Sequence, residues 1–131
     1  MPRPPSSHPT ELELEILKIV WRDGRSSVRQ VRDALEAAGR KLAHTSVITV
    51  MNIMSDKGYL KRSKKEAGFV YAAKVSRGAT LGKMLRDLVD RAFGGSGAAA
   101  MLNLLESNDV TREELDQLRD VIAKKSKEKR P

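Results

Sequence analysis

The sequence predicts a mainly α-helical chain that carries one small β-hairpin. Apolar residues recur at helical spacing in three segments before residue 58 and in three more after residue 76. Two short β-prone runs, 59–62 and 69–72, lie between these groups and flank a polar, basic turn over 63–68. Three helices followed by a hairpin, within about 60 residues, is the order of a winged helix-turn-helix domain.

The first predicted helix follows a proline-rich lead over residues 1–9, which we expect to be disordered. Thr10 and Glu13 have the spacing of a capping box, and Asp23-Gly24 ends the helix. A wide apolar stripe predicts that this helix is well buried; its members are Leu12, Leu14, Ile16, Leu17, Ile19, Val20 and Trp21. The acidic residues that alternate with the start of this stripe, Glu11, Glu13 and Glu15, are expected to be solvated and to complement the helix dipole.

The second and third predicted helices complete the helix-turn-helix. Ser27 is the expected cap of the second, which turns Val28, Val31 and Leu35 inward and closes at Gly39. The third begins near residues 44–46 and stops at Gly58. Its apolar stripe consists of Val47, Val50, Met51 and Met54. We place the winged domain at residues 10–75.

Residues 76–123 are expected to form a helical dimerisation region. Gly94-Gly95 separates its first two helices, and Thr111 with Glu114 gives a second capping box. Three short helices cannot bury such stripes alone, which favours a homodimer, although folding back onto the winged domain of the same chain is an alternative. The dimerisation residues are Leu81, Leu85, Leu88, Met101, Leu102, Leu105, Leu115, Leu118 and Ile122. Residues 124–131 are expected to be a fraying basic tail.

Charge and composition narrow the class of partner. The 131 residues carry a net charge of +8, of which +7 falls in residues 1–78 and +1 in the remainder. A basic front half favours a polyanion as partner. The absence of cysteine excludes disulfides, thiolate metal sites and cysteine nucleophiles. No segment is long and apolar enough to cross a bilayer or act as a signal peptide, so we expect a soluble cytoplasmic protein.

Neither a catalytic site nor a cofactor is predicted. The two histidines fall in the lead and at a helix start, where helical spacing brings neither to a partner. The glycine cluster at 94–97 follows a helix instead of a strand, so it does not form a phosphate-binding loop. The sequence therefore favours a binding protein over an enzyme, with no metal and no cofactor.

The third helix carries the residues that point to duplex DNA. Opposite its apolar stripe stand short polar side chains suited to reading base edges, namely His44, Thr45, Ser46, Thr49 and Asn52. The hairpin adds four cations that we expect to cluster at its tip and meet phosphates, namely Lys61, Arg62, Lys64 and Lys65, and the second helix adds Arg29. Taken alone, the polar face is also compatible with an ordinary solvated helix surface.

Several of these segments resemble the penicillinase-repressor family (BlaI/MecI/CopY). The resemblance is carried by residues 42–52 with 57–60, by the opening segment 11–21 and by 93–95, and it covers about residues 10–123. It implies a dimeric winged-helix repressor of transcription on a palindromic operator. It also implies that Thr45, Ser46 and Thr49 enter the major groove while Lys64 and Lys65 approach the backbone.

Three departures from the family pattern bear on what the resemblance implies. Ile53 stands where many relatives have Arg, which removes one expected contact. In the β-lactam branch a sensor-linked protease cuts an Asn-Phe bond, and the aligned bond here is Asn103-Leu104. Asn103 is equally compatible with a capping or surface role. Copper sensing through thiolates is excluded because the chain has no cysteine. The alternative function is an architectural or protein-interaction winged helix with non-specific DNA affinity.

Overall fold

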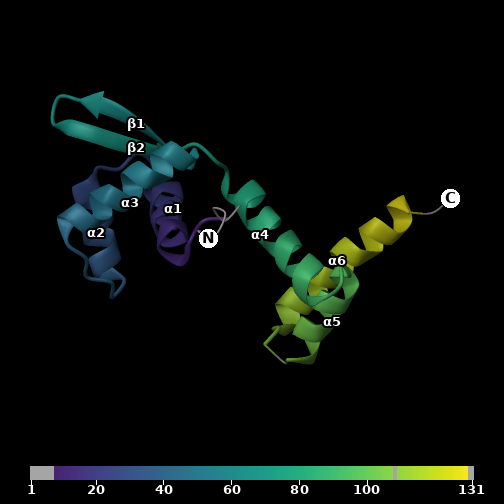
Figure 1. Ribbon diagram of the computed structural model, residues 1–131. Coiled ribbons are helices and arrows are strands. Elements are labelled where there is room, and N and C mark those ends of the chain that lie inside the picture. The colour runs from purple at the N-terminus through teal and green to yellow at the C-terminus, as the bar shows by residue number, and fades with distance from the viewer. Residues whose placement is uncertain (1–7, 108, 130–131) are drawn as a thin grey trace. The chain divides into compact units, whose positions relative to one another are not determined.

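The computed structural model describes residues 8–107 and 109–129, which form six helices and a two-stranded sheet (Figure 1). These residues divide into two compact units, one ending at Met84 and the other beginning at Leu85. The mainly helical fold with one hairpin is confirmed. In chain order the elements are α1 (Glu11–Asp23), α2 (Val28–Ala37), α3 (His44–Lys57), β1 (Leu60–Lys65), β2 (Gly68–Ala73), α4 (Arg77–Ala92), α5 (Gly97–Glu106) and α6 (Arg112–Glu128).

The predicted helix ends are confirmed at several caps. The Thr10 hydroxyl accepts from the Glu13 N–H at 3.2 Å, and the Glu13 carboxylate accepts from the Thr10 N–H at 2.8 Å. Thr111 and Glu114 form the same reciprocal pair at the start of α6. Gly58 ends α3 in the left-handed region, with φ of 87°, where glycine has no side chain to clash. Local sequence therefore sets these boundaries.

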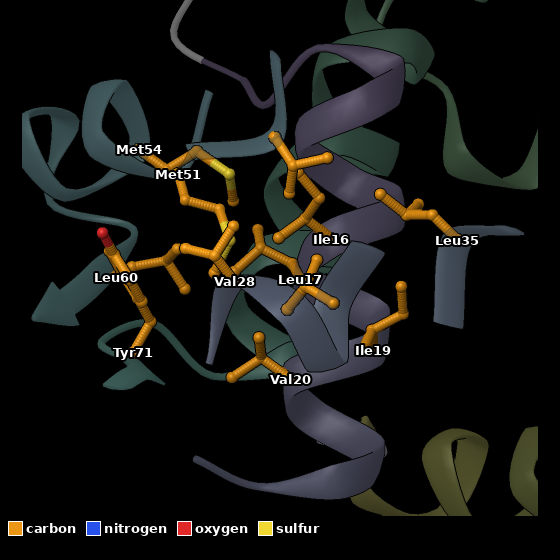
Figure 2. Close-up of a cluster of buried hydrophobic side chains, with 12 residues drawn as sticks. Ile16, Leu17, Ile19, Val20, Val28, Leu35, Met51, Met54, Leu60 and Tyr71 are labelled. Atoms are coloured by element: carbon orange, nitrogen blue, oxygen red, sulfur yellow. The ribbon is translucent and has the colours of Figure 1, made fainter. Parts of the chain in front are cut away.

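The core of the first unit lies between α1, α2, α3 and the hairpin. Figure 2 shows side chains from α1 meeting those of α3 and of the two strands. The cluster consists of Ile16, Leu17, Ile19, Val20, Val28, Val31, Leu35, Val47, Met51, Met54, Leu60 and Tyr71. The Trp21 indole N–H donates to the Val75 carbonyl at 2.9 Å and so fastens the chain after β2 to α1. The apolar stripes predicted for these helices thus form one core.

The hairpin strands are longer than predicted. β1 pairs antiparallel with β2 from Leu60 opposite Ala73 to Lys65 opposite Gly68, so the assignment of 63–68 as the turn was wrong. Ser63 and Lys64 have little intrinsic strand preference, but Val70 and Phe69 stand directly opposite them. Cross-strand packing of this kind outweighs residue propensity.

A short pairing outside the hairpin was not predicted. The Ser26 N–H donates to the Tyr71 carbonyl at 3.0 Å, and the Tyr71 N–H donates to the Ser26 carbonyl at 2.8 Å. A one-residue bridge has no periodicity from which it could have been recognised. It joins the segment between α1 and α2 to β2, so the hairpin is tied to the helices by backbone as well as by side chains.

The role expected for Glu13 requires correction. Its carboxylate is only 3% exposed and accepts from the Lys57 ammonium at 3.0 and 3.2 Å, which joins the first turn of α1 to the last turn of α3. Glu15 is likewise paired, with Arg40 at 2.7 Å, at a half-exposed site. Burial, and secondly the Glu13 carboxylate, raises the pKa of the neighbouring Tyr59 hydroxyl. Because Lys57 lies 44 residues from Glu13, no local pattern could have indicated this pair.

The second unit buries little of its own apolar surface. Within its described residues Ala100 is the one buried side chain. Large apolar residues that remain exposed there are Leu85, Leu88, Met101, Leu102, Leu104, Leu105, Leu115, Leu118, Val121 and Ile122. Several of them line a groove of about 710 Å³ along α5 and α6. The stripes expected for a dimerisation region therefore face solvent in the single chain, except for Leu81 of the first unit, which is half-buried.

The end of α6 also differs from expectation. The helix continues to Glu128, so the fraying expected from residue 124 is contradicted for 124–128. Lysine and glutamate are good helix formers, and the basic residues of the last turn interact favourably with the negative end of the helix dipole. The lead that we expect to be disordered falls outside the described residues for 1–7, as do the last two residues of the expected tail.

We predict that Lys57→Met destabilises the first unit by about 2–3 kcal/mol, because it leaves the buried Glu13 carboxylate without its cation. Adding Glu13→Gln keeps a capping acceptor but removes the buried charge, so the double variant should regain most of that loss. Urea denaturation followed by the fluorescence of Trp21, the single tryptophan, measures both. Arg22→Met, which breaks an exposed pair with Asp23, is the control and should leave the midpoint unchanged. Equal midpoints for Lys57→Met and Arg22→Met would contradict the role of the buried pair.

Candidate nucleic-acid interface

Helix α3 presents a polar face to solvent because its apolar face is held in the core. Val47, Met51 and Met54 are fully buried. The opposite face carries most of the residues predicted to read bases, and His44, Thr45, Ser46 and Thr49 are all exposed on it. α3 also begins at Ala43 without a side-chain cap, whereas α1, α2, α5 and α6 each begin at a capping Ser or Thr. The N-terminal half of α3 is thus open to a ligand.

Thr49 lies in the middle of this face with its hydroxyl already oriented. The hydroxyl donates to the Thr45 carbonyl one turn earlier, at 2.8 Å. The O–H is therefore engaged, so the oxygen faces a ligand as an acceptor through its lone pairs, and the methyl group stands beside it. In this rotamer Thr49 suits the exocyclic amino group of adenine or cytosine, both of which are donors in the major groove.

Asn52 occupies a different environment from the other polar residues of α3. Its side-chain oxygen accepts from the Tyr71 hydroxyl at 2.8 Å and from the Arg62 guanidinium at 3.3 Å. The residue is half-buried where α3 meets the hairpin. Asn52 is predicted from the sequence to be a base-reading residue, and in the structure it lies at the contact between α3 and the hairpin. The spacing of residues along α3 could not have indicated this contact, because Tyr71 lies on β2.

The cations of β1 are exposed along the strand on both of its faces. Because side chains alternate, Arg62 and Lys64 share a face with Tyr71, and Lys61 and Lys65 lie on the other. The expectation that all four cluster at the hairpin tip is therefore wrong: only Lys64 and Lys65 adjoin the turn. Figure 1 shows the hairpin lying alongside α3, with its turn end projecting away from the helices.

Arg62 is held in place by two contacts. In addition to its hydrogen bond with Asn52, its guanidinium carbon lies 4.5 Å from the centre of the Phe69 ring on β2. A cation over an aromatic face is attracted by the ring quadrupole, so Arg62 is oriented before any ligand arrives. Arg29, the fifth cation assigned to phosphate contact, is exposed in the first turn of α2.

Other kinds of site find no support in the described residues. In that part of the chain no group of three or more His, Asp or Glu side chains could hold a metal ion. None of the described helices is long and apolar enough to cross a membrane. The arrangement that does stand out is a polar helix face next to a hairpin bearing a row of cations.

A three-helix core with an antiparallel hairpin against its third helix defines a winged helix-turn-helix protein. The chain belongs to the penicillinase repressor family, whose model matches residues 9–124. The family resemblance seen in the sequence is thereby confirmed. Members of this family are DNA-binding regulators of transcription and not enzymes.

Individual relatives support the same assignment. The transcriptional regulator BlaI of Mycobacterium tuberculosis (strain CDC 1551 / Oshkosh) is 30% identical over 115 residues, covering 86% of this chain and 81% of the relative. The methicillin resistance regulatory protein MecI of Mammaliicoccus sciuri is 22% identical over 113 residues, covering 86% and 91%. The penicillinase repressor of Bacillus licheniformis is also 22% identical over 113 residues, covering 86% and 88%. The chain therefore spans most of the length of each.

We predict that Tyr71→Phe loosens the hairpin without disturbing the core. The substitution removes the hydrogen bond to Asn52 but keeps the buried ring, so the free energy of unfolding should fall by about 1 kcal/mol. Amide hydrogen exchange in β1 should become faster. Tyr59→Phe is the matched control, because the Tyr59 hydroxyl makes no hydrogen bond within the described residues. Unchanged exchange and stability in Tyr71→Phe would show that this contact does not position the hairpin.

Proposed function

We propose that this chain represses transcription as a homodimer bound to a palindromic DNA operator. The observation that carries the proposal is the exposed polar face of α3 beside the cations of β1. A helix of this kind fits the major groove, and a basic hairpin next to it can follow the phosphate backbone. Because the proposed partner is double-stranded operator DNA, we place the protein in the cytoplasm.

The residues divide into two roles. His44, Thr45, Ser46 and Thr49 read base edges from the first half of α3, where side chains are exposed and the helix start is uncapped. Contacts with phosphate come from Lys61, Arg62, Lys64, Lys65 and Arg29. Asn52 supports both groups because its hydrogen bonds to Tyr71 and Arg62 fix the hairpin relative to α3. We therefore propose Asn52 as a positioning residue.

The apolar face of the second unit supports the homodimer. A monomer rarely leaves so many large apolar side chains exposed in one short segment. A second copy of the same chain would offer the same α5–α6 groove and the same leucine-rich face, as a twofold interface requires. The two copies of α3 would then read half-sites about 34 Å apart, which is one turn of B-DNA.

The Asn103-Leu104 bond supports relief of repression by a sensor-linked protease. Both residues are exposed in the middle of α5, and the caps of that helix are Ser96 and Ser107, so Asn103 is not a cap. A cut at this bond would separate Leu104 and α6 from the rest of the chain. Because α6 contributes most of the residues that line the groove, the cut would weaken dimerisation and leave α3 unchanged.

We predict that the full chain selects one dyad from random-sequence DNA and that Thr49→Ala broadens this preference at one position of each half-site. The wild-type Thr49 oxygen discriminates between bases through a single hydrogen bond, worth about tenfold. Sequencing of the selected DNA and binding titrations measure both effects.

Lys64→Ala is the matched comparison for Thr49→Ala. It should weaken binding to every sequence alike and reduce the slope of log affinity against log salt by about one. A wild-type chain that protects DNA without a preferred dyad would instead support the architectural winged helix. Unchanged base preference in Thr49→Ala would overturn the role given to α3.

We predict that Leu118→Asp converts the dimer into a monomer, because it puts a charge into the apolar groove of α5 and α6. Affinity for the dyad should fall about 100-fold or more, since each monomer would then bind its half-site alone. Analytical ultracentrifugation and DNA titration test this. Ala123→Asp changes an exposed α6 residue that does not line the groove and should leave the dimer intact. A monomeric wild-type chain, or a dimeric Leu118→Asp chain, would contradict the proposal.

A further inference from the structure

One large apolar side chain stands on the exposed face of α3. Ile53 is 44% exposed, whereas Val47, Met51 and Met54 of the same helix are buried. It follows Thr49 by four residues and Ser46 by seven, so the three lie on one stripe of the helix. Ile53 is therefore part of the face that α3 turns outward.

Ile53 differs from the other exposed apolar residue of the first unit. Within the described residues of that unit, the large hydrophobic side chains that are exposed are Ile53 and Phe69. The Phe69 ring lies under the Arg62 guanidinium, which covers one of its faces. The exposed part of the Ile53 side chain is available to whatever occupies the face of α3.

We propose that Ile53 recognises the 5-methyl group of a thymine in the operator. This inference rests on the proposed function, because it requires α3 to enter the major groove of DNA. In that groove thymine is the base that presents an apolar group, and recognition helices meet it with apolar side chains. A polar base edge opposite Ile53 would lose its water without gaining a partner, which disfavours the other three bases at this position.

The position of Ile53 along the helix separates its target from that of Thr49. Four residues advance the helix axis by about 6 Å, close to the rise of two base pairs. Recognition helices contact bases with residues spread over about two turns, so a contact seven residues after Ser46 lies within their usual reach. Ile53 therefore reads a different base pair from Thr49, by shape and hydrophobicity instead of hydrogen bonding.

Replacement of thymine by uracil tests this inference, because it removes the methyl group and leaves every hydrogen-bonding group in place. The dyad selected by the wild-type chain is synthesised with deoxyuridine at one thymine of the half-site at a time. We expect one position at which uracil lowers wild-type affinity about fourfold, the effect of one buried methyl-sized group. At that position Ile53→Ala should bind thymine and uracil equally. Ile53→Leu, which keeps an apolar side chain of the same size, should still favour thymine.

The outcomes separate this inference from the proposed function. A wild-type chain that selects a dyad but loses nothing with uracil at any thymine overturns the role of Ile53 and leaves the repressor proposal standing. The same holds if Ile53→Ala keeps the full uracil penalty at every position. A wild-type chain that selects no dyad overturns both. Because Ile53 lies outside the core, its variants should unfold at the wild-type urea midpoint, which the Trp21 fluorescence reports.

Discussion

The geometry of the first unit depends on how Tyr71 is held. Its ring is 1% exposed in the core, its hydroxyl donates to Asn52 of α3, and its backbone pairs in both directions with Ser26. One residue thus links β2 to α3, the helix proposed to face the DNA, and to the segment between α1 and α2. A hairpin of two strands is marginally stable by itself, and these contacts give it a fixed place. The same Asn52 oxygen also accepts a hydrogen bond from the Arg62 guanidinium, so this cation of β1 is oriented by the same contact.

The first unit buries most of its large apolar side chains fully or partly, whereas the second leaves most of its own exposed. In the first, twelve buried side chains close a core, and the buried Glu13–Lys57 pair ties the start of α1 to the end of α3. In the second, leucines and methionine stay exposed along α5 and α6. Affinity for DNA and assembly would then reside in separate segments, so assembly can change without alteration of the surface that meets the bases. Control through the second unit would adjust occupancy of the DNA and leave sequence preference intact.

Much of the fold could be predicted because it depends on local rules. The capping boxes at Thr10 and Thr111, the glycine that ends α3 and the apolar stripes of the helices involve residues within one or two turns of each other. The wrong predictions concern packing that residue propensity and periodicity do not report. Glu13 was expected in solvent because its partner Lys57 lies 44 residues away, outside any local window. The hairpin turn was predicted too long because cross-strand packing outweighs the low strand preference of Ser63 and Lys64. The expected tail after residue 123 failed for a different reason: helix propensity and the helix dipole continue α6 to Glu128.

The sequence by itself determined the order of the elements, the polar face of α3, the basic character of the first half and the family to which the chain belongs. Helical periodicity, capping and charge depend on residues that are close together in the chain, so they can be predicted without a structure. Tertiary structure decided which polar residues of α3 face outward and which do not. It turned Asn52 toward Tyr71, distributed the β1 cations over two faces and left Ile53 uncovered. Those outcomes depend on what packs against each side chain, and in a folded chain that neighbour is set by long-range contacts.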